Sequence, residues 1–285
     1  MKKLLFQMCA AAGLVAIVVS PARAQSRPLV TEDPETVPAG FMLLETGIEH
    51  QHSAVYPATG LSGNRWRIGT FGLSIGVSSI AELQIDGGLR DRLQIENRNS
   101  AAPLASFVTA TGDSTATFED LLIGAKVRFV SETESRPAVA LRFTTRLPNS
   151  SLDSGLSLDT FDFNIGLAVA KTVRSTRVAM NVGIGFLDDP IEIADQTHMI
   201  NFGTSFARAV ATGVEIVGEV TGRFNVSEDE PPAGNESRGA FRFGGRFTRG
   251  PVRVDGGMLI GVTDKDPSWG FSGGVTWVFK AFEVK

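Results

Sequence analysis

Apolar and polar residues alternate along this chain in segments of about ten residues, from residue 41 to residue 279. Residues 118–130 illustrate the pattern, with Leu121, Ile123, Ala125, Val127 and Phe129 on one face and Asp120, Lys126 and Arg128 on the other. Because the side chains of a β-strand point alternately to two faces, this period predicts strands with one apolar and one polar face. We expect an all-β fold of about twelve antiparallel strands, at 41–50, 65–77, 81–96, 118–130, 138–147, 161–173, 176–187, 198–208, 213–225, 239–247, 252–262 and 269–279.

The connections between these segments alternate in length. Tight turns such as 174–175 and 248–251 follow long polar connections such as 97–117, 148–160 and 226–238. Outer-membrane barrels have short periplasmic turns and longer outer loops. The order therefore predicts a single closed antiparallel transmembrane β-barrel over 41–279, with both termini at the periplasmic end and a short tail at 280–285.

The polar face of the predicted strands is too charged for a dry core. It carries Glu82, Asp86, Arg90, Arg92, Lys126, Arg128, Arg142, Arg146, Asp162, Arg177, Glu215, Glu219, Arg242, Arg246, Arg253 and Asp255. Burying so many ions without water would cost several kcal/mol each unless every one were paired. We therefore expect these residues to line a wet lumen. The apolar face, including Leu83, Leu89, Leu93 and Ile95, is then expected to contact lipid.

Two alternatives remain open at this point. The apolar face could line a soluble barrel that holds a lipid, although twelve strands make that less natural. Within the membrane-barrel interpretation, the mixed charges of the lumen form either a salt-bridge lattice that stiffens the wall or a transverse field that orients solutes. We expect the lattice at least in part.

The chain begins with the features of a secretory signal peptide at residues 1–24. Lys2 and Lys3 precede an apolar run at 4–19, and small residues at 22 and 24 offer a cleavage site. Residues 25–40 contain three prolines, which exclude a central strand, and we expect them to form a periplasmic N-terminal segment. If this segment folded inward, it would narrow the pore.

Composition and charge exclude several functions. The chain has 27 basic and 31 acidic residues, and loss of the signal peptide makes it more acidic, which argues against nucleic acid as a partner. Its one cysteine, Cys9, lies in the signal peptide, so the mature chain has no disulfide. His50, His52 and His198 show no catalytic or metal-ligand spacing. We expect no enzymatic activity, no metal and no cofactor.

Acidic clusters occur in the predicted outer loops, at 188–189, 228–230 and 264–266. The simplest interpretation is that these clusters are solvated loop surface. The alternative is that their carboxylates bind Ca²⁺ or Mg²⁺ ions held between lipopolysaccharide phosphates.

Several stretches resemble the phenol-degradation-type outer-membrane proteins of the MetA pathway. They are RPLVTEDPETVPAG and FMLLETGIEH at 27–50, DLLIGAKVRF at 120–129, AVALRFTTRLPNS at 138–150, FDFNIGLAVAKTV at 161–173 and TRVAMNVGIGFLDDP at 176–190. The resemblance implies an envelope β-barrel transporter, linked by the family's name to aromatic catabolism, and brings no catalytic residues. The last strand also resembles the signal read by the barrel-assembly machinery, through Ser272, Gly274, Trp277 and Phe279.

The sequence thus predicts a passive outer-membrane channel for small solutes, aromatic or hydrophobic compounds among them. The alternative is a narrow closed barrel with a structural or surface-interaction role. The expected partners are the bilayer, lipopolysaccharide, the barrel-assembly machinery and a small solute.

Overall fold

The computed structural model describes residues 27–192, 196–226 and 231–283, so the predicted signal peptide at 1–24 lies outside the described residues. Thirteen strands form one sheet. Their bounds are β1 Phe41–Tyr56, β2 Leu61–Gly76, β3 Ala81–Arg98, β4 Ser114–Thr117, β5 Leu122–Val130, β6 Ala138–Arg146, β7 Asp162–Val173, β8 Thr176–Asp188, β9 Gln196–Ala211, β10 Val214–Asn225, β11 Arg238–Arg249, β12 Val252–Gly261 and β13 Trp269–Lys280. Two single-turn 3₁₀ helices, η1 (Ala105–Phe107) and η2 (Leu152–Ser154), lie in the outer connections. The described residues include no helix long and apolar enough to cross a membrane.

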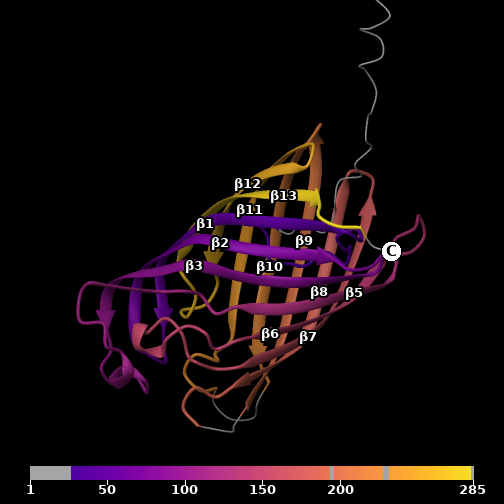
Figure 1. Cartoon of the computed structure of the whole chain (residues 1–285). Coiled ribbons are helices and arrows are strands. Elements are labelled where there is room, and N and C mark those ends of the chain that lie inside the picture. Colours follow the sequence, from indigo (N-terminus) through magenta and orange to yellow (C-terminus); the bar gives the residue numbers. More distant parts are fainter. Residues whose placement is uncertain (1–26, 193–195, 227–230, 284–285) are drawn as a thin grey trace, which may run out of the picture.

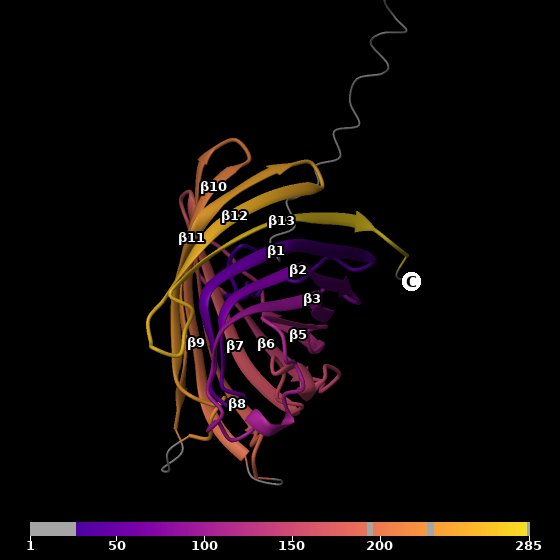
Figure 2. The same ribbon diagram turned by 90° about the vertical axis from the view of Figure 1, so that its left-hand side faces the viewer.

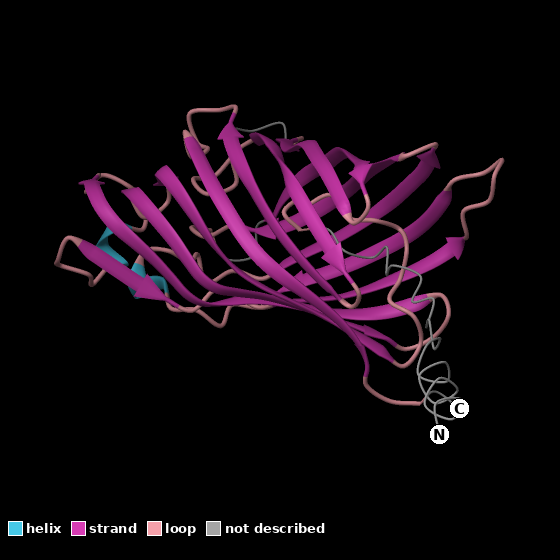
Figure 3. Ribbon diagram, turned by 90° about the horizontal axis from the view of Figure 1, so that it is seen from above, coloured by secondary structure: helices cyan, strands magenta, loops and turns pink. Residues whose placement is uncertain are grey.

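Twelve of the strands close into a barrel. Each long strand pairs antiparallel with its neighbour in the chain, and β1 pairs with β13 to complete the ring, with Phe41 opposite Lys280. The four-residue β4 adds to the outer half of β3. Figures 1 and 2 show this continuous curved wall, and Figure 3 shows that strands make up most of the described chain. The predicted all-β, twelve-stranded antiparallel barrel is confirmed.

The first outer connection is much shorter than the sequence pattern suggested. The expected loop at 51–64 is only a turn at 57–60, because β1 and β2 continue to pair past the point where their alternation stops. Ser53 and Gly63 both have positive φ beside a register shift between these strands. An irregularity of this kind adds a residue and breaks the period of two without ending the strand.

A second irregularity changes the face that β2 and β3 present to the lumen. Gly69 adopts a φ of 67°, and beyond it Arg67 and Asp91 point inward while Trp66 and Ile68 are exposed outside. Arg90 lies opposite Ile68 and Arg92 opposite Trp66. Residues directly opposite in a ladder share a face.

Four predicted positions on β3 are therefore wrong. Arg90 and Arg92, expected in the lumen, lie on the outer surface. Leu93, expected against lipid, is fully buried inside against Leu61 and Ala54, and Ile95 packs on the same cluster. The prediction assumed that every second residue of β3 faces the lumen along the whole strand. The faces are exchanged near Gly69 and Leu89, so the assumption is wrong beyond that point.

Candidate functional site

The outer face of the barrel is a band of exposed apolar side chains. It includes Ile48, Leu83, Ile123, Met180, Val182, Ile184, Ile216, Phe241, Phe243, Phe247, Val254, Val275 and Trp277. Exposed apolar area on this scale is typical of a surface that contacts lipid, and most charged side chains of the same strands point to the opposite face, with Arg90 and Arg92 of β3 among the exceptions. The chemistry of this chain that can act on solutes therefore lies in the lumen.

The N-terminal segment, residues 27–38, lies inside the lumen. The sequence predicted a periplasmic segment and left open that it folds inward, and the structure has the inward arrangement for these residues. The segment contacts side chains or backbone from strands on every side of the wall, namely β2, β3, β5, β6, β8, β10, β11, β12 and β13. An irregular chain can be buried only where its backbone groups find partners, and the polar lumen supplies them.

Glu219 on β10 holds the middle of the N-terminal segment. Its carboxylate accepts hydrogen bonds from the backbone amides of Val30 (2.9 Å) and Thr31 (2.8 Å) and from the Thr31 hydroxyl (2.7 Å). Arg242 lies 3.3 Å from the same carboxylate. On β8, Asn181 accepts from the Glu32 amide and donates to the Glu32 carbonyl (2.9 Å). The side chains of the wall thus satisfy backbone groups of the segment that a neighbouring strand would satisfy in a sheet.

Arg27 holds the start of the described segment against β2, β11, β12 and β13. Its guanidinium donates to Thr70 Oγ1 and to the Gly273 carbonyl, both at 3.2 Å, and lies 3.6 Å from Asp255. The carbonyl of Arg27 accepts from Arg246 Nε at 2.6 Å. Two of the predicted lumen residues, Asp255 and Arg246, therefore bind the segment.

Lys126 on β5 is the most buried charge in the lumen. Its ammonium lies 3.0 Å from Glu82 and 3.2 Å from Glu32, and donates to the Asp33 carbonyl at 2.9 Å. Lys126 and Glu82 have fully buried side chains, and Glu82 also accepts from the Val37 amide at 2.5 Å. A buried ion pair of this kind is retained only with full hydrogen bonding, so the segment and the wall depend on each other here.

Arg177 and Arg128 fix the segment near the short-turn end. Arg177 pairs with Asp33 and lies 2.8 Å from Glu132 in the β5–β6 turn, and Arg128 pairs with Glu35. Burial alone would raise the pKa of the Glu132 carboxyl, but hydrogen bonds from the Thr172 amide, Arg177 and Lys171 outweigh it and lower that pKa to about 2. Glu132 therefore stays ionised and keeps Arg177 in place.

Glycines on the inner wall make room for the segment. A Cβ on Gly47 or on Gly274 would lie 2.3 or 2.4 Å from an Arg27 nitrogen, and one on Gly203 would lie 2.8 Å from Thr31 Oγ1. Gly47 and Gly274 are paired across β1 and β13. Glycines at inward strand positions are a sequence signal of close backbone approach, and they were the available clue to the segment's location.

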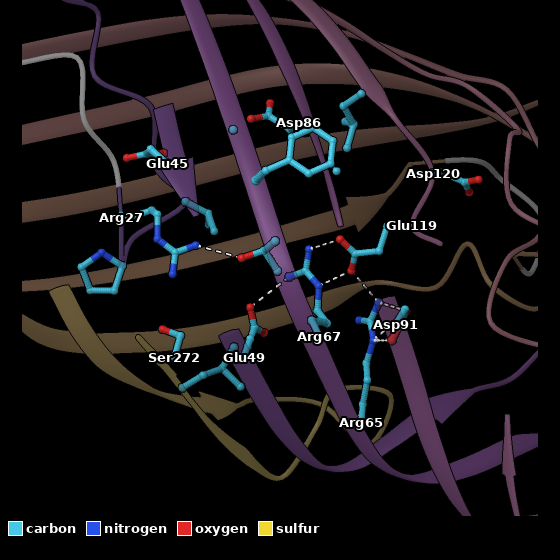
Figure 4. A pocket seen from close by; sticks show the side chains of 18 of the residues that line it. Arg27, Glu45, Glu49, Arg65, Arg67, Asp86, Asp91, Glu119, Asp120 and Ser272 are labelled. Carbon is cyan, nitrogen blue, oxygen red and sulfur yellow. Dashed lines mark hydrogen bonds and ion pairs between the residues drawn. The ribbon is translucent and has the colours of Figure 1, made fainter. Parts of the chain in front are cut away.

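A second charged cluster lies between the segment and the outer loops, and the sequence analysis missed it (Figure 4). Arg65 binds Asp91 at 2.5 Å and lies 3.4 Å from Glu119, which also pairs with Arg67, and Arg67 reaches Glu49 at 2.9 Å. Glu119 comes from the connection between β4 and β5. The cluster was missed because the phase change near Gly69 reverses the faces of β2 and β3.

The remaining predicted residues pair with one another along the wall. Arg142 lies 3.7 Å from Asp86 and 3.4 Å from Glu32. Arg146 binds Asp162 at 2.6 Å, with Asp120 at 3.8 Å. Glu215 lies between Arg253 at 3.6 Å and Arg246 at 4.0 Å. The lumen is thus a lattice of ion pairs, as expected in part.

Three hollow regions remain in the lumen, two of them beside the segment, and all three are lined in part by Arg65, Arg146, Leu156 and Arg242. Their volumes are about 730, 380 and 260 Å³. The charged residues that line the largest are Arg65, Arg142, Arg146, Arg223, Arg238 and Arg242, together with Glu32 and Asp266. Arg223 donates to the carbonyls of Gly234 and Glu236. More arginines than carboxylates therefore line this cavity, and Arg65, Arg142, Arg146 and Arg242 are paired with carboxylates around it.

The histidines lie apart from this interior chemistry, whereas Asp266 of the acidic cluster at 264–266 lines the largest cavity. His50 and His52 belong to an aromatic group on the outer face with Trp66 and Trp269. The described part of the chain contains no group of three or more His, Cys, Asp or Glu side chains that could hold a metal ion. Residues 228–230 lie outside the described residues.

The residues of the predicted assembly signal fall on both faces of β13. Trp277 is exposed on the outside and its ring lies 4.4 Å from that of Phe279. Ser272 and Gly274 face the lumen, where Ser272 lines the 380 Å³ cavity and Gly274 approaches Arg27. The structure therefore gives Gly274 a packing role beside the segment.

Comparison with known proteins finds the same kind of barrel among outer-membrane proteins. No protein-family model and no curated protein match the sequence. The COG4313 outer membrane channel from Pseudomonas putida F1 is similar in structure, with a TM-score of 0.61 and 12% identity over 87% of this chain and 98% of that chain. The translocator domain of the autotransporter NalP from Neisseria meningitidis has a TM-score of 0.48 and 9% identity, over 85% of this chain and 89% of its own. The first of these similarities shows the fold, a closed β-barrel like that of the COG4313 outer membrane channel.

Proposed function

We propose that this protein is a passive outer-membrane channel for small solutes, with the N-terminal segment forming its constriction. The observation that carries the proposal is the connected, charged interior on both sides of that segment. A barrel with a purely structural role needs no such space, whereas a pathway for solutes requires a continuous polar one.

The charge of the largest cavity favours small anions. Six arginines and two carboxylates line it, and the charge of a pore wall sets the local ion concentration. A carboxylate-bearing solute would meet Arg223, which among the described residues donates only to backbone carbonyls, and would compete with wall carboxylates for Arg142 and Arg146. Passage of aromatic solutes is supported only by the family resemblance. Equal uptake of phenolic compounds by cells with and without the protein would contradict it.

The alternative function is a closed barrel with a structural or surface-interaction role. The segment's contacts with nine strands favour it, because a fully anchored segment blocks the lumen. Single-channel recording in planar bilayers separates the two proposals. Discrete conductance steps from the folded protein support the channel, and a correctly inserted but silent barrel supports the closed form.

Reversal of two wall charges is expected to change ion selectivity. The variant Arg142→Glu/Arg146→Glu should shift the reversal potential toward cations at low salt, and the shift should shrink at molar salt because screening shortens the Coulomb interaction. The matched control is Arg208→Glu/Arg249→Glu, which makes the same charge change at exposed positions at the short-turn end. Unchanged selectivity in the first variant would identify these arginines as lattice only.

The last strand is proposed as the assembly signal, and its outward aromatics give the test. Trp277→Ala or Phe279→Ala should slow membrane insertion, because both rings lie together at the short-turn end of β13. The measurement is the yield of heat-modifiable, protease-resistant barrel over time. Wild-type rates for both variants would contradict the assignment.

A further inference from the structure

Two arginines on the outer face of β3 are exposed without a partner. Arg90 and Arg92 form no ion pair or side-chain hydrogen bond with any residue that the structure describes, and both are exposed. They lie on the lipid side of the wall, opposite Ile68 and Trp66. An unpaired arginine on the lipid-facing side of a barrel is unfavourable unless it reaches an interface or an anion.

Their position along β3 corresponds to the outer membrane interface. The strand runs from the short turn at 77–80 to the long outer connection at 99–121. Leu83, Ile85 and Leu89 project outward on the short-turn side of the arginines, and Leu89 is 61% exposed. Because long loops face the outside, Arg90 and Arg92 come where the apolar band ends toward the outer leaflet.

An aromatic row continues from Arg92 around the barrel at this level. Trp66 lies opposite Arg92, its ring lies 4.5 Å from that of His50 and 5.7 Å from that of Phe271, and Trp269 adjoins His50. Aromatic rings mark the membrane–water interface of outer-membrane barrels. On the other side of Arg92, β4 contributes only Ala116 opposite it, so the guanidinium is left uncovered.

We propose that Arg90 and Arg92, with Trp66 and His50 beside them, bind the phosphate of a phosphorylated glycolipid of the outer leaflet. Charge complementarity selects this occupant, because guanidinium groups bind phosphate in a bidentate manner. The apolar surface of Leu83, Ile85 and Leu89 lies directly below for the acyl chains. The acyl chains and the phosphate of one lipid molecule then meet the apolar band and the arginines at once.

The next charged residue outward is consistent with a sugar-phosphate headgroup. Glu96 is exposed and accepts a hydrogen bond from Asn64 Nδ2 at 2.7 Å. A carboxylate at that height, beyond the arginines, is a hard oxygen ligand for a divalent cation shared with a second phosphate.

The test is lipid retention by the whole folded barrel, measured by native mass spectrometry during titration with bisphosphorylated lipid A. Dephosphorylated lipid A and phosphatidylglycerol are the parallel probes. Arg90→Ala/Arg92→Ala is compared with Arg208→Ala/Arg249→Ala, which removes two exposed outward arginines at the short-turn end. Heat-modifiability establishes that each variant is folded, and Arg90→Lys/Arg92→Lys provides a conservative second variant.

We expect the wild-type barrel to retain one bisphosphorylated lipid, and Arg90→Ala/Arg92→Ala to bind it about thirtyfold more weakly. The control pair should bind as the wild type, the lysine variant should be intermediate, and dephosphorylated lipid A and phosphatidylglycerol should bind weakly to all. Equal affinity of wild type and Arg90→Ala/Arg92→Ala overturns the proposal. So does equal binding of phosphorylated and dephosphorylated lipid by the wild type, or an equal loss in the control pair.

Discussion

Deletion of residues 27–37 is expected to raise single-channel conductance severalfold. The segment crosses the lumen and lines both of the larger cavities, so its removal adds its volume to theirs and gives one wider path. Lys126, Arg128 and Arg177 lose partners in this variant, but the vacated space admits water, which solvates them. The measurement is conductance in planar bilayers, alongside heat-modifiability as a test of folding.

A disulfide variant separates a fixed constriction from a movable one. A Cβ on Gly203 would lie 3.6 Å from Thr31 Cβ, within the range for a disulfide, and residues 25–285 contain no cysteine of their own. Thr31→Cys/Gly203→Cys should conduct less when oxidised than when reduced if the segment moves during passage. Equal conductance in both states indicates a static constriction.

Unchanged conductance after deletion of residues 27–37 would contradict the proposal that the N-terminal segment is the constriction.

Replacement of Lys126 by methionine is expected to destabilise the barrel by about 3–5 kcal/mol, the usual cost of removing one partner from a buried ion pair. Lys126→Met leaves the fully buried Glu82 carboxylate without its counter-ion. The second change Glu82→Gln should recover a large part of the loss, because it removes the unpaired charge. Denaturant unfolding from lipid vesicles measures the free energy for both variants.

Lys171 provides the matched control for this prediction. Its ammonium lies 3.3 Å from Glu132 and its side chain is 30% exposed. Exposed pairs contribute up to about 1 kcal/mol, so Lys171→Met should have a small effect. Equal losses for Lys126→Met and Lys171→Met would show that the burial of Lys126 carries no special energetic weight.

Interactions that follow from strand alternation were predictable residue by residue. Arg142 and Arg146 on β6, and Glu215 and Glu219 on β10, share the inner face because they are separated by an even number of positions, and the structure places all four inward. The prediction for Arg90 on β3 was wrong for a local reason. The phase change lies beside Gly69 on the partner strand β2, and the sequence of β3 alone shows no break in its alternation.

The sequence by itself determined the all-β barrel, its strand order and the charged character of its interior, because these depend on a period of two and on loop lengths, which are local properties. The tertiary structure alone decided that residues 27–38 lie in the lumen and that Arg90 and Arg92 lie outside. The physical reason is that both depend on contacts between residues far apart in sequence, such as Thr31 with Glu219. Such a contact forms only after the closed wall has brought its two partners together, and the inward glycines of the wall indicate a close approach without identifying the partner.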